Sequence, residues 1–470
     1  MAGWKPAPRV FVTVESVVFH PFPFNRWTCA GTLPMLSQQI LRRAAWTTVP
    51  AVLTLVIPAA IAAQPPDEIR IARLIRGLGS DSFVDRDRAN EELASLGPVA
   101  RTQLEQAVED PDPEVRLRAK SLLKRIRVGE LWSPARVHYQ ASEVSASEAL
   151  AAIVRQTGNR VLVGDQYGAF RDQQVDLDHG DSAFWEVVDD LCRRSGNRVR
   201  PHYDTRTPGL VLVSGNLGMH PVAYAGPVRA MVTHARRVFT EDLDYEQLEA
   251  ERAHTFQLDL QAMWEDRFRL VAYRSQPELI EAVTAEGAAL AAAQATSGGW
   301  NIAGPGTRQV ALSLRLHPPA TTAKAIGTLK LKWGLIAVGD MATIEVADLH
   351  STEPRFQDDV ELVIEGFQQG PGPRCELTLV VVRDLVVPEP QELLFQENEV
   401  ELFDTQGRAF RKQGQTNNLG ERGAVSKLTF TGDSADSVPK LLRFNYPRIR
   451  SQKDLEIVFR DVPLPTSRPE

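Results

Sequence analysis

The residues of this chain with the best spacing for metal chemistry are Asp176, Asp178, His179 and Asp181. Carboxylates and an imidazole are common metal ligands, but this spacing matches no established ligand pattern well. Asp181 or Ser182 is also well placed to cap a following helix. We therefore interpret the run as the polar end of a strand followed by a helix cap, with a metal site as the alternative.

Other patterns that carry chemistry are absent from the sequence. It contains no G-x-S-x-G, H-E-x-x-H, P-loop or G-x-G-x-x-G, and none of the histidines are spaced i, i+4. The acid pairs Asp189-Asp190 and Asp358-Asp359 are expected on solvated faces, whereas general acid catalysis needs a carboxyl group in a pocket. We expect no catalytic, cofactor-binding or metal-binding residue and no cofactor, so the protein is predicted not to be an enzyme.

The cysteine spacing and the net charge argue against two further classes of function, namely zinc or thiol-redox sites and nucleic-acid binding. Cys29, Cys192 and Cys375 lie far apart and form no C-x-x-C pair, so nothing supports a zinc or thioredoxin-like site. Cys192 and Cys375 are expected to be buried free thiols, with a disulfide between them as the alternative. The formal net charge of −7 and the aromatic content of 7% disfavour a nucleic-acid partner.

The N-terminal segment has the features of an export signal. Two arginines precede the uncharged stretch 44–63, which ends in the small-x-small pattern Ala60-Ile-Ala62. We expect residues 1–34 to be a mis-called extension and residues 35–63 to be a signal peptide. The protein is then periplasmic or secreted. The alternative is an inner-membrane protein anchored by an uncleaved signal, which would be its one contact with the membrane.

Residues 64–129 show the apolar periodicity of α-helices. The helices are expected to end at Gly77, to stop and restart at Gly97-Pro98, and to begin again with Asp112 as N-cap and Pro113 as first residue. Apolar side chains at helical spacing are expected to face the core: Phe83, Ala89, Leu93 and Leu96.

Two pieces of this helical segment resemble a HEAT-type repeat. They are the run Asp110-Pro-Asp-Pro-Glu-Val-Arg-Leu-Arg-Ala119 and the Leu-Gly-Pro-Val-Ala turn at 96–100. The resemblance implies a protein-contact module of one or two units, which is short for a solenoid. A structural cap packed on the next domain is the alternative. The basic side chains of 116–127 are expected to form a solvated helix face.

A phrase ending in Gly-Asn-Arg-Val occurs twice within residues 130–218, at 145–161 and at 182–199. Each copy predicts an amphipathic helix that is closed by Gly-Asn and followed by a strand. The alternating segments around the two copies give the order β-α-β-β-α-β-β.

This region resembles the short N-terminal periplasmic domain shared by secretins and TonB-dependent receptors. The resemblance rests on Ala149-Leu150, Thr157-Gly-Asn159-x-Val161, Val175-x-Leu177, Ser195-Gly-Asn197-x-Val199 and the closing Leu210 to Val213. It implies a domain that mediates protein contacts and carries no catalytic residue. No outer-membrane barrel or secretin ring domain follows, so a pore or receptor role is not implied.

Residues 226–350 and 356–465 each contain a series of alternating strands, and the second series repeats the order of the first. Five strands of the first series have counterparts in the second: 228–239 in 360–364, 256–260 in 375–379, 282–290 in 402–410, 329–333 in 442–446, and 344–347 in 455–458. We expect two tandem sandwiches that resemble immunoglobulin-like domains. Trp333 and Tyr446 are expected in their cores, with a ligand platform as the alternative.

The sequence thus predicts a multidomain α+β protein with a short α-helical repeat segment, a βαββαβ domain and two tandem antiparallel β-sandwiches. We expect a non-catalytic exported envelope protein that acts as a protein-interaction or assembly scaffold. Its partner would be an unidentified envelope protein and not a nucleic acid. The alternatives are a carbohydrate or cell-wall binding protein acting through the sandwiches, and a hydrolase with an unrecognised site.

Overall fold

The computed structural model describes most of the chain from residue 66 onward. The described ranges are 66–163, 173–202, 209–215, 217–218, 220–244, 249–293, 298–304, 306–383, 398–420, 423–434 and 436–465. All of them belong to the compact unit Gln64–Glu470. The expected extension 1–34, the signal peptide 35–63 and Cys29 lie outside the described residues.

No helix in these described ranges combines the length and the apolar character needed to cross a membrane.

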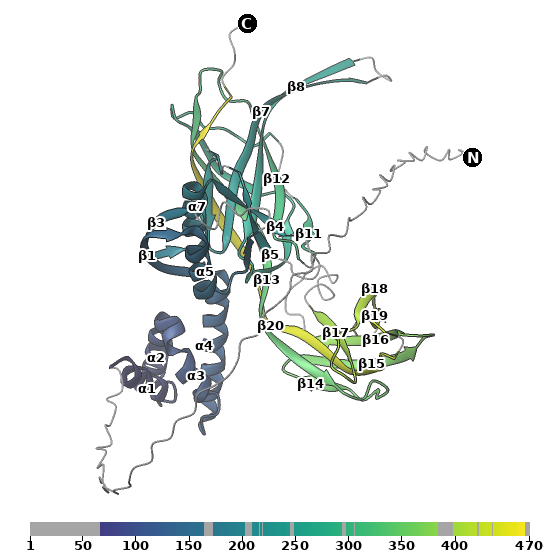
Figure 1. Cartoon of the computed structure of the whole chain (residues 1–470). Helices are drawn as coiled ribbons and strands as arrows, with labels where there is room; N and C mark the ends of the chain where they lie inside the picture. Colours follow the sequence, from purple (N-terminus) through teal and green to yellow (C-terminus); the bar gives the residue numbers. More distant parts are fainter. Residues whose placement is uncertain are drawn as a thin grey trace, which may run out of the picture. The chain divides into compact units, whose positions relative to one another are not determined.

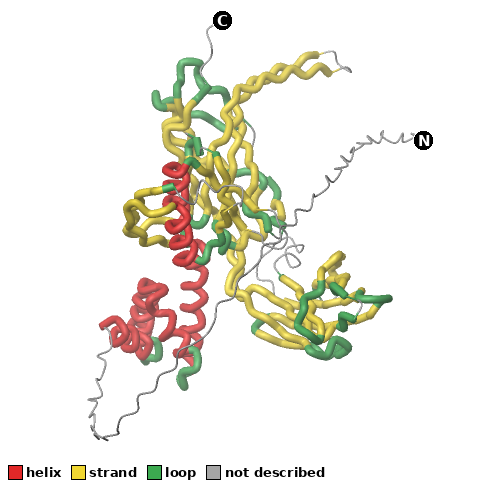
Figure 2. Tube along the Cα trace, in the orientation of Figure 1, coloured by secondary structure: helices red, strands yellow, loops and turns green. Residues whose placement is uncertain are grey.

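The helices lie within residues 66–195, and strands dominate the rest of the described chain. Figure 2 distinguishes the two by colour, with helices red and strands yellow. The helical segment comprises α1 (Pro66–Gly77), α2 (Phe83–Leu96), the 3-10 turn η1 (Gly97–Ala100), α3 (Arg101–Ala107) and α4 (Pro113–Trp132) (Figure 1). Asp112 caps α4, because its carboxylate accepts a hydrogen bond from the Glu114 N–H at 2.8 Å. The expected boundaries at Gly77, Gly97 and Asp112 are confirmed.

The helical segment has a core of its own. Ala89 and Leu93 are buried in it as expected, together with Ile71, Leu104 and Leu122. The prediction for Phe83 was wrong, since its side chain is 66% exposed. Phe83 is the first residue of α2 and lies outside the shared core.

Helix α4 continues past the expected end at residue 129 and packs on the β-rich part. The indole Nε1 of Trp132 donates to Ser451 Oγ at 2.9 Å, and its ring centroid lies 5.3 Å from that of Phe268. Gly226, at φ 56°, is needed here, because a Cβ would lie 2.4 Å from the Trp132 carbonyl oxygen. An ion pair of 2.6 Å joins Arg127 to Asp340.

The next region contains β1 (Arg136–Ser145), α5 (Ala146–Thr157), β2 (Val161–Val163), β3 (Gln174–Ala183), α7 (Phe184–Ser195), β4 (Asn197–His202) and β5 (Gly209–Ser214). This confirms the expected order β-α-β-β-α-β-β. Strands β1 and β3 form an antiparallel pair, and β5 lies between β4, antiparallel, and β2, parallel. Side chains of both helices and both sheets share one core.

The remaining strands form the two β-rich modules. The first supplies β6 (Val222–Ala225), β7 (Val228–Asp244), β8 (Glu249–Trp264), β9 (Arg269–Arg274), β10 (Glu278–Thr284), β11 (Trp300–Ile302), β12 (Gln309–Leu316) and β13 (Ala325–Val346). The second supplies β14 (Arg355–Gln357), β15 (Val360–Gln369), β16 (Arg374–Arg383), β17 (Glu399–Asp404), β18 (Arg411–Leu419), β19 (Ala424–Thr431) and β20 (Pro439–Pro463).

Three sheets enclose two cores. The sheet β12-β8-β7-β6 covers the first core and β14-β15-β16-β19-β18 covers the second. The third sheet, β11-β9-β13-β20-β17 with β10 beside β13, faces both. Trp333 and Tyr446 are 0% exposed in the first and second core respectively, as expected.

Local pairing repeats between the two modules where the sequence predicted it. In the first module Ala282 pairs with Leu329, and in the second Leu402 pairs with Leu442. Each early strand then turns at a positive-φ glycine, Gly287 or Gly407. The following bridges, Val283 to Ala289 and Phe403 to Ala409, are also equivalent. The predicted repeat is therefore present in the strand register.

The expected boundary between the two sandwiches, at residues 350–356, does not separate the two cores. Segments 329–333 and 343–346, expected as separate strands, belong to one strand, β13, and β20 is likewise continuous. The two strands pair antiparallel from Ala325 opposite Pro463 to Val346 opposite Leu442. Residues 455–464 consequently complete the first core, and residues 342–349 contribute to the second.

Both described cysteines are free and buried, and they lie in different cores. The interpretation of Cys192 and Cys375 as buried thiols is confirmed. The alternative of a disulfide between them was wrong, because one belongs to the α+β core and the other to the second sandwich core.

Candidate functional site

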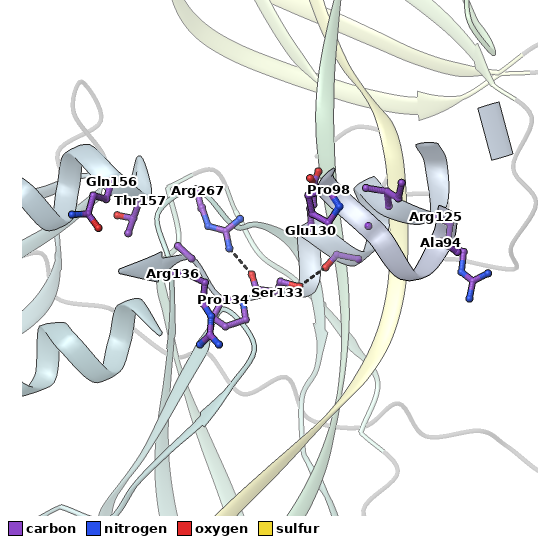
Figure 3. Close-up of a pocket in the computed structure, with 14 residues that line it drawn as sticks. Ala94, Pro98, Arg125, Glu130, Ser133, Pro134, Arg136, Gln156, Thr157 and Arg267 are labelled. Atoms are coloured by element: carbon purple, nitrogen blue, oxygen red, sulfur yellow. Dashed lines mark hydrogen bonds between the residues drawn. The ribbon is translucent and has the colours of Figure 1, made fainter. Parts of the chain in front are cut away.

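A cleft of about 700 Å³ lies between the helical segment, the linker that follows α4 and the C-terminal end of α5 (Figure 3). Its polar lining comes from segments far apart in the sequence: Arg125, Glu130, Ser133, Arg136, Gln156, Thr157 and Arg267. No residue of this cleft was predicted from the sequence to form a functional site, because no local motif links these segments.

Each charged side chain of the cleft already has a partner within the chain. Arg125 pairs with Glu91 at 3.2 Å, Glu130 with Arg101 at 3.2 Å, and Arg136 with Asp181 at 3.2 Å. Arg267 pairs with Glu265 at 2.6 Å and also donates to the Ser133 carbonyl oxygen (Figure 3). The charged side chains that line the cleft are thus all ion-paired within the chain. These pairs connect the segments around the cleft and leave none of these described side chains unpaired for acid–base catalysis.

The wall of the cleft is held by one buried carboxylate, Glu265, which is 0% exposed. It accepts hydrogen bonds from the Ala135 N–H at 2.9 Å, from Asn159 Nδ2 at 3.1 Å and from Arg267 Nε at 2.6 Å. The Asn159 Oδ1 in turn accepts from the Arg267 N–H at 3.1 Å. Because a buried charge is costly unless paired and hydrogen-bonded, these contacts join the linker, the end of α5 and the β8–β9 turn.

A second buried carboxylate, Asp189, corrects the sequence interpretation. It was expected on a solvated face, but it is 0% exposed and accepts from Arg229 Nε at 2.7 Å and from the Tyr224 hydroxyl at 2.8 Å. Asp189 follows Trp185 by four residues and precedes Cys192 by three, so it belongs to the buried stripe of α7. That spacing was the sequence signal for its burial.

Burial around Asp189 raises the pKa of two weakly acidic groups beside it. Burial, and then the nearby Asp189 carboxylate, raises the pKa of the Cys192 thiol to about 12. The same two causes raise the pKa of the Tyr224 hydroxyl. Both groups are therefore protonated at neutral pH, and Cys192 lacks the thiolate form that a nucleophile needs.

The other acid pair, Asp358-Asp359, is exposed as expected, with 41% and 45% of the two side chains accessible. Asp358 accepts from the Tyr446 hydroxyl at 2.5 Å and from Arg448 Nε at 2.8 Å. These hydrogen bonds, working against burial, lower the pKa of Asp358.

The residues weighed as metal ligands have separate protein partners. Asp176 accepts from the Glu143 N–H at 2.8 Å, Asp178 accepts from Gln140 at 2.6 Å, and Asp181 pairs with Arg136. Among the described residues there is no group of three or more acidic, histidine or cysteine side chains placed to hold a metal ion.

The helix cap expected at Asp181 or Ser182 was wrong. Helix α7 begins at Phe184 and its N-cap is Ala183, whose N–H donates to Glu186 Oε2 at 3.0 Å. A carboxylate on the third helical residue therefore satisfies this end of the helix, and the Ser182 hydroxyl is left for another contact.

That contact places a hydroxyl, an imidazole and a carboxylate in series. His179 Nδ1 lies 3.1 Å from Ser182 Oγ, and His179 Nε2 lies 3.1 Å from Asp190 Oδ2. With the proton on Nε2, the carboxylate orients the ring and Nδ1 accepts from the serine, so the order of groups is that of a Ser-His-Asp triad with the two ring nitrogens exchanged. Asp190 also accepts from Arg194 at 3.0 Å, and none of these side chains lines the cleft.

Comparisons with known proteins found no match to this chain among protein-family models, curated proteins or solved structures.

Proposed function

We propose that the protein is a non-catalytic scaffold of the bacterial envelope that holds protein-contact surfaces in fixed positions. The observation that carries this proposal is the Glu265 cluster, in which a fully buried carboxylate joins three chain segments. A charged group with this many donors specifies one arrangement of the segments around it.

The architecture supports the same proposal. The paired helices of 66–132 are consistent with a HEAT-like contact module. Helices α5 and α7, with a two-stranded and a three-stranded sheet, are consistent with a secretin-type domain. Two layered β-modules with repeated register are consistent with immunoglobulin-like sandwiches. We further propose export to the periplasm, on the basis of the signal-like residues 35–63.

Exposed apolar side chains support the helical segment as the proposed contact surface. Five large apolar residues there are 49–66% exposed: Ile69, Phe83, Val84, Val99 and Leu117. Apolar side chains gathered on one small module favour an interaction surface.

A photo-crosslinking residue placed at Phe83, Val99 or Leu117 tests the scaffold in intact envelopes. We expect a discrete protein adduct from at least one of these positions and none from Gln413, an exposed polar position on β18. Retention on purified cell-wall glycan without any protein adduct would contradict the scaffold and support the carbohydrate-binding alternative.

The Ser182–His179–Asp190 series favours one second candidate, a serine hydrolase. A fluorophosphonate probe separates the two functions, because it labels only activated serines. The scaffold predicts no labelling, whereas labelling that disappears in Ser182→Ala would establish the hydrolase.

A further inference from the structure

A groove of about 920 Å³ runs between α1 and α3 on the helical segment. Each helix contributes residues from successive turns. The apolar part of its lining is formed by Ile71, Ala72, Ile75, Val99 and Ala107, and α3 adds the polar side chains of Thr102, Gln103 and Gln106. Two parallel rows of side chains at i, i+3 and i+4 spacing form the kind of surface on which a third helix packs.

Val99 is the most informative residue of the groove. It lies in the turn η1 directly after Pro98 and is 62% exposed, although the neighbouring Ala100 is 0% exposed. An exposed β-branched side chain in a proline-containing turn that lines the groove offers a preformed contact for an apolar side chain of a partner.

The rim of the groove is acidic. Asp67, Glu68 and Asp110 line it, against a single base, Arg76. Within the described part of the chain, neither Asp67 nor Glu68 has an ion-pair partner, and the Asp110 carboxylate accepts only the Asp112 N–H. By contrast, Glu92, Glu105 and Glu114 on the same segment each pair with an arginine.

We propose that this groove binds an amphipathic helix of a partner protein, with apolar residues on one face and lysine or arginine at its edges. The proposal rests on the scaffold function. The apolar lining residues receive the apolar face of that helix, and the unpaired carboxylates meet its basic edges, which favours basic over acidic segments.

Fluorescence anisotropy of the full chain with a labelled leucine–lysine helical peptide, about four turns long, tests the proposal. Val99→Glu places a like-charged, polar group in the groove, and we expect it to weaken binding about tenfold. Val84→Glu is the matched control, since Val84 is 64% exposed on α2 and does not line the groove. It should bind as the unchanged protein does.

A charge-reversal pair tests the rim independently. Glu68→Lys should weaken binding of the basic peptide and reduce its dependence on salt, whereas Asp87→Lys, an equal charge change at an exposed position of α2, should not. Circular dichroism checks that all four variants keep their helices. A leucine–glutamate peptide should bind at least about tenfold more weakly than the leucine–lysine peptide.

Equal binding to the Val99→Glu and Val84→Glu variants would overturn the proposal, and so would equal binding of the two peptides. Binding seen only when the chain starts at Gln64 would instead assign the groove to the chain's own N-terminal residues. Self-association abolished by Val99→Glu would assign it to a second copy. Crosslinks from Leu117 but not from Val99 would overturn the groove and leave the scaffold standing.

Discussion

The two copies of the repeated Gly-Asn motif adopt the same backbone conformation, but their asparagine side chains make different contacts. Gly158 and Gly196 are left-handed, with φ of 68° and 63°, and each N–H donates to a carbonyl four residues earlier. The side chains that follow differ. Asn197 donates to the Ser195 carbonyl oxygen at 2.6 Å and stays within its own turn.

The side chain of Asn159 instead bonds to residues outside the α+β core region. Its amide donates to Glu265 and accepts from the Arg267 N–H, so it contacts the β8–β9 turn of the first sandwich. A repeat that closes a helix in both copies has thus acquired a second role in one copy, in the contact between two domains. The difference shows that two copies of a motif can share a backbone conformation while a side chain in one copy bonds to residues distant in the sequence.

The largest effect is expected from Glu265→Gln, which removes the charge that the Asn159 copy contacts. The new amide NH₂ would face donors, so the free energy of unfolding should fall by about 3 kcal/mol. Urea unfolding measures this loss. Glu345→Gln is the control, because Glu345 forms an exposed 2.7 Å pair with Arg443 and should cost less than about 1 kcal/mol. Equal losses would show that Glu265 contributes no more to stability than an exposed, ion-paired glutamate.

A smaller and unequal effect is expected from Asn159→Ala and Asn197→Ala. The first leaves the Arg267 N–H without its acceptor and removes one of the donors to Glu265, so it should cost about 2 kcal/mol, against about 1 kcal/mol for the second. Combining Asn159→Ala with Glu265→Gln should cost less than the sum of the two changes. Additive losses, or equal losses at the two asparagines, would contradict the domain-joining role of Asn159.

The smallest effect, and an equal one, is expected from Gly158→Ala and Gly196→Ala. A Cβ at either position meets no atom within 4 Å, so only the left-handed backbone is strained. Each change should lower the free energy of unfolding by about 1 kcal/mol. A clear difference between the two would show that the backbones of the copies are not equivalent.

Local features of the fold could be predicted from the sequence. Asp112, Pro113 and Gly97 act on the turns that contain them, so the helix boundaries could be read directly. The register of Ala282 and Leu402 could be predicted because each strand is followed closely by its turn glycine.

Features that depend on distant partners could not be predicted. In the sequence, strand β13 looks like two strands, because residues 333–338 are buried on both faces and do not alternate. In the structure, Asp340 takes a positive φ of 51° within the continuous strand. The ion-pair partner of Asp189 is Arg229, forty positions along the chain, and the cleft is assembled from segments that share no motif. The Ser182 contact was hidden because Glu186, not a preceding residue, satisfies the start of α7.

The exchange of half-strands between β13 and β20 has a consequence for the order in which the protein is made. Residues 455–464, which close the core of the first sandwich, are synthesised after the whole of the second. During translation, the core of the earlier module stays incomplete and exposes hydrophobic surface until the later module has been synthesised. The second module can therefore be regarded as an insertion in a long hairpin, and the two complete their folding together.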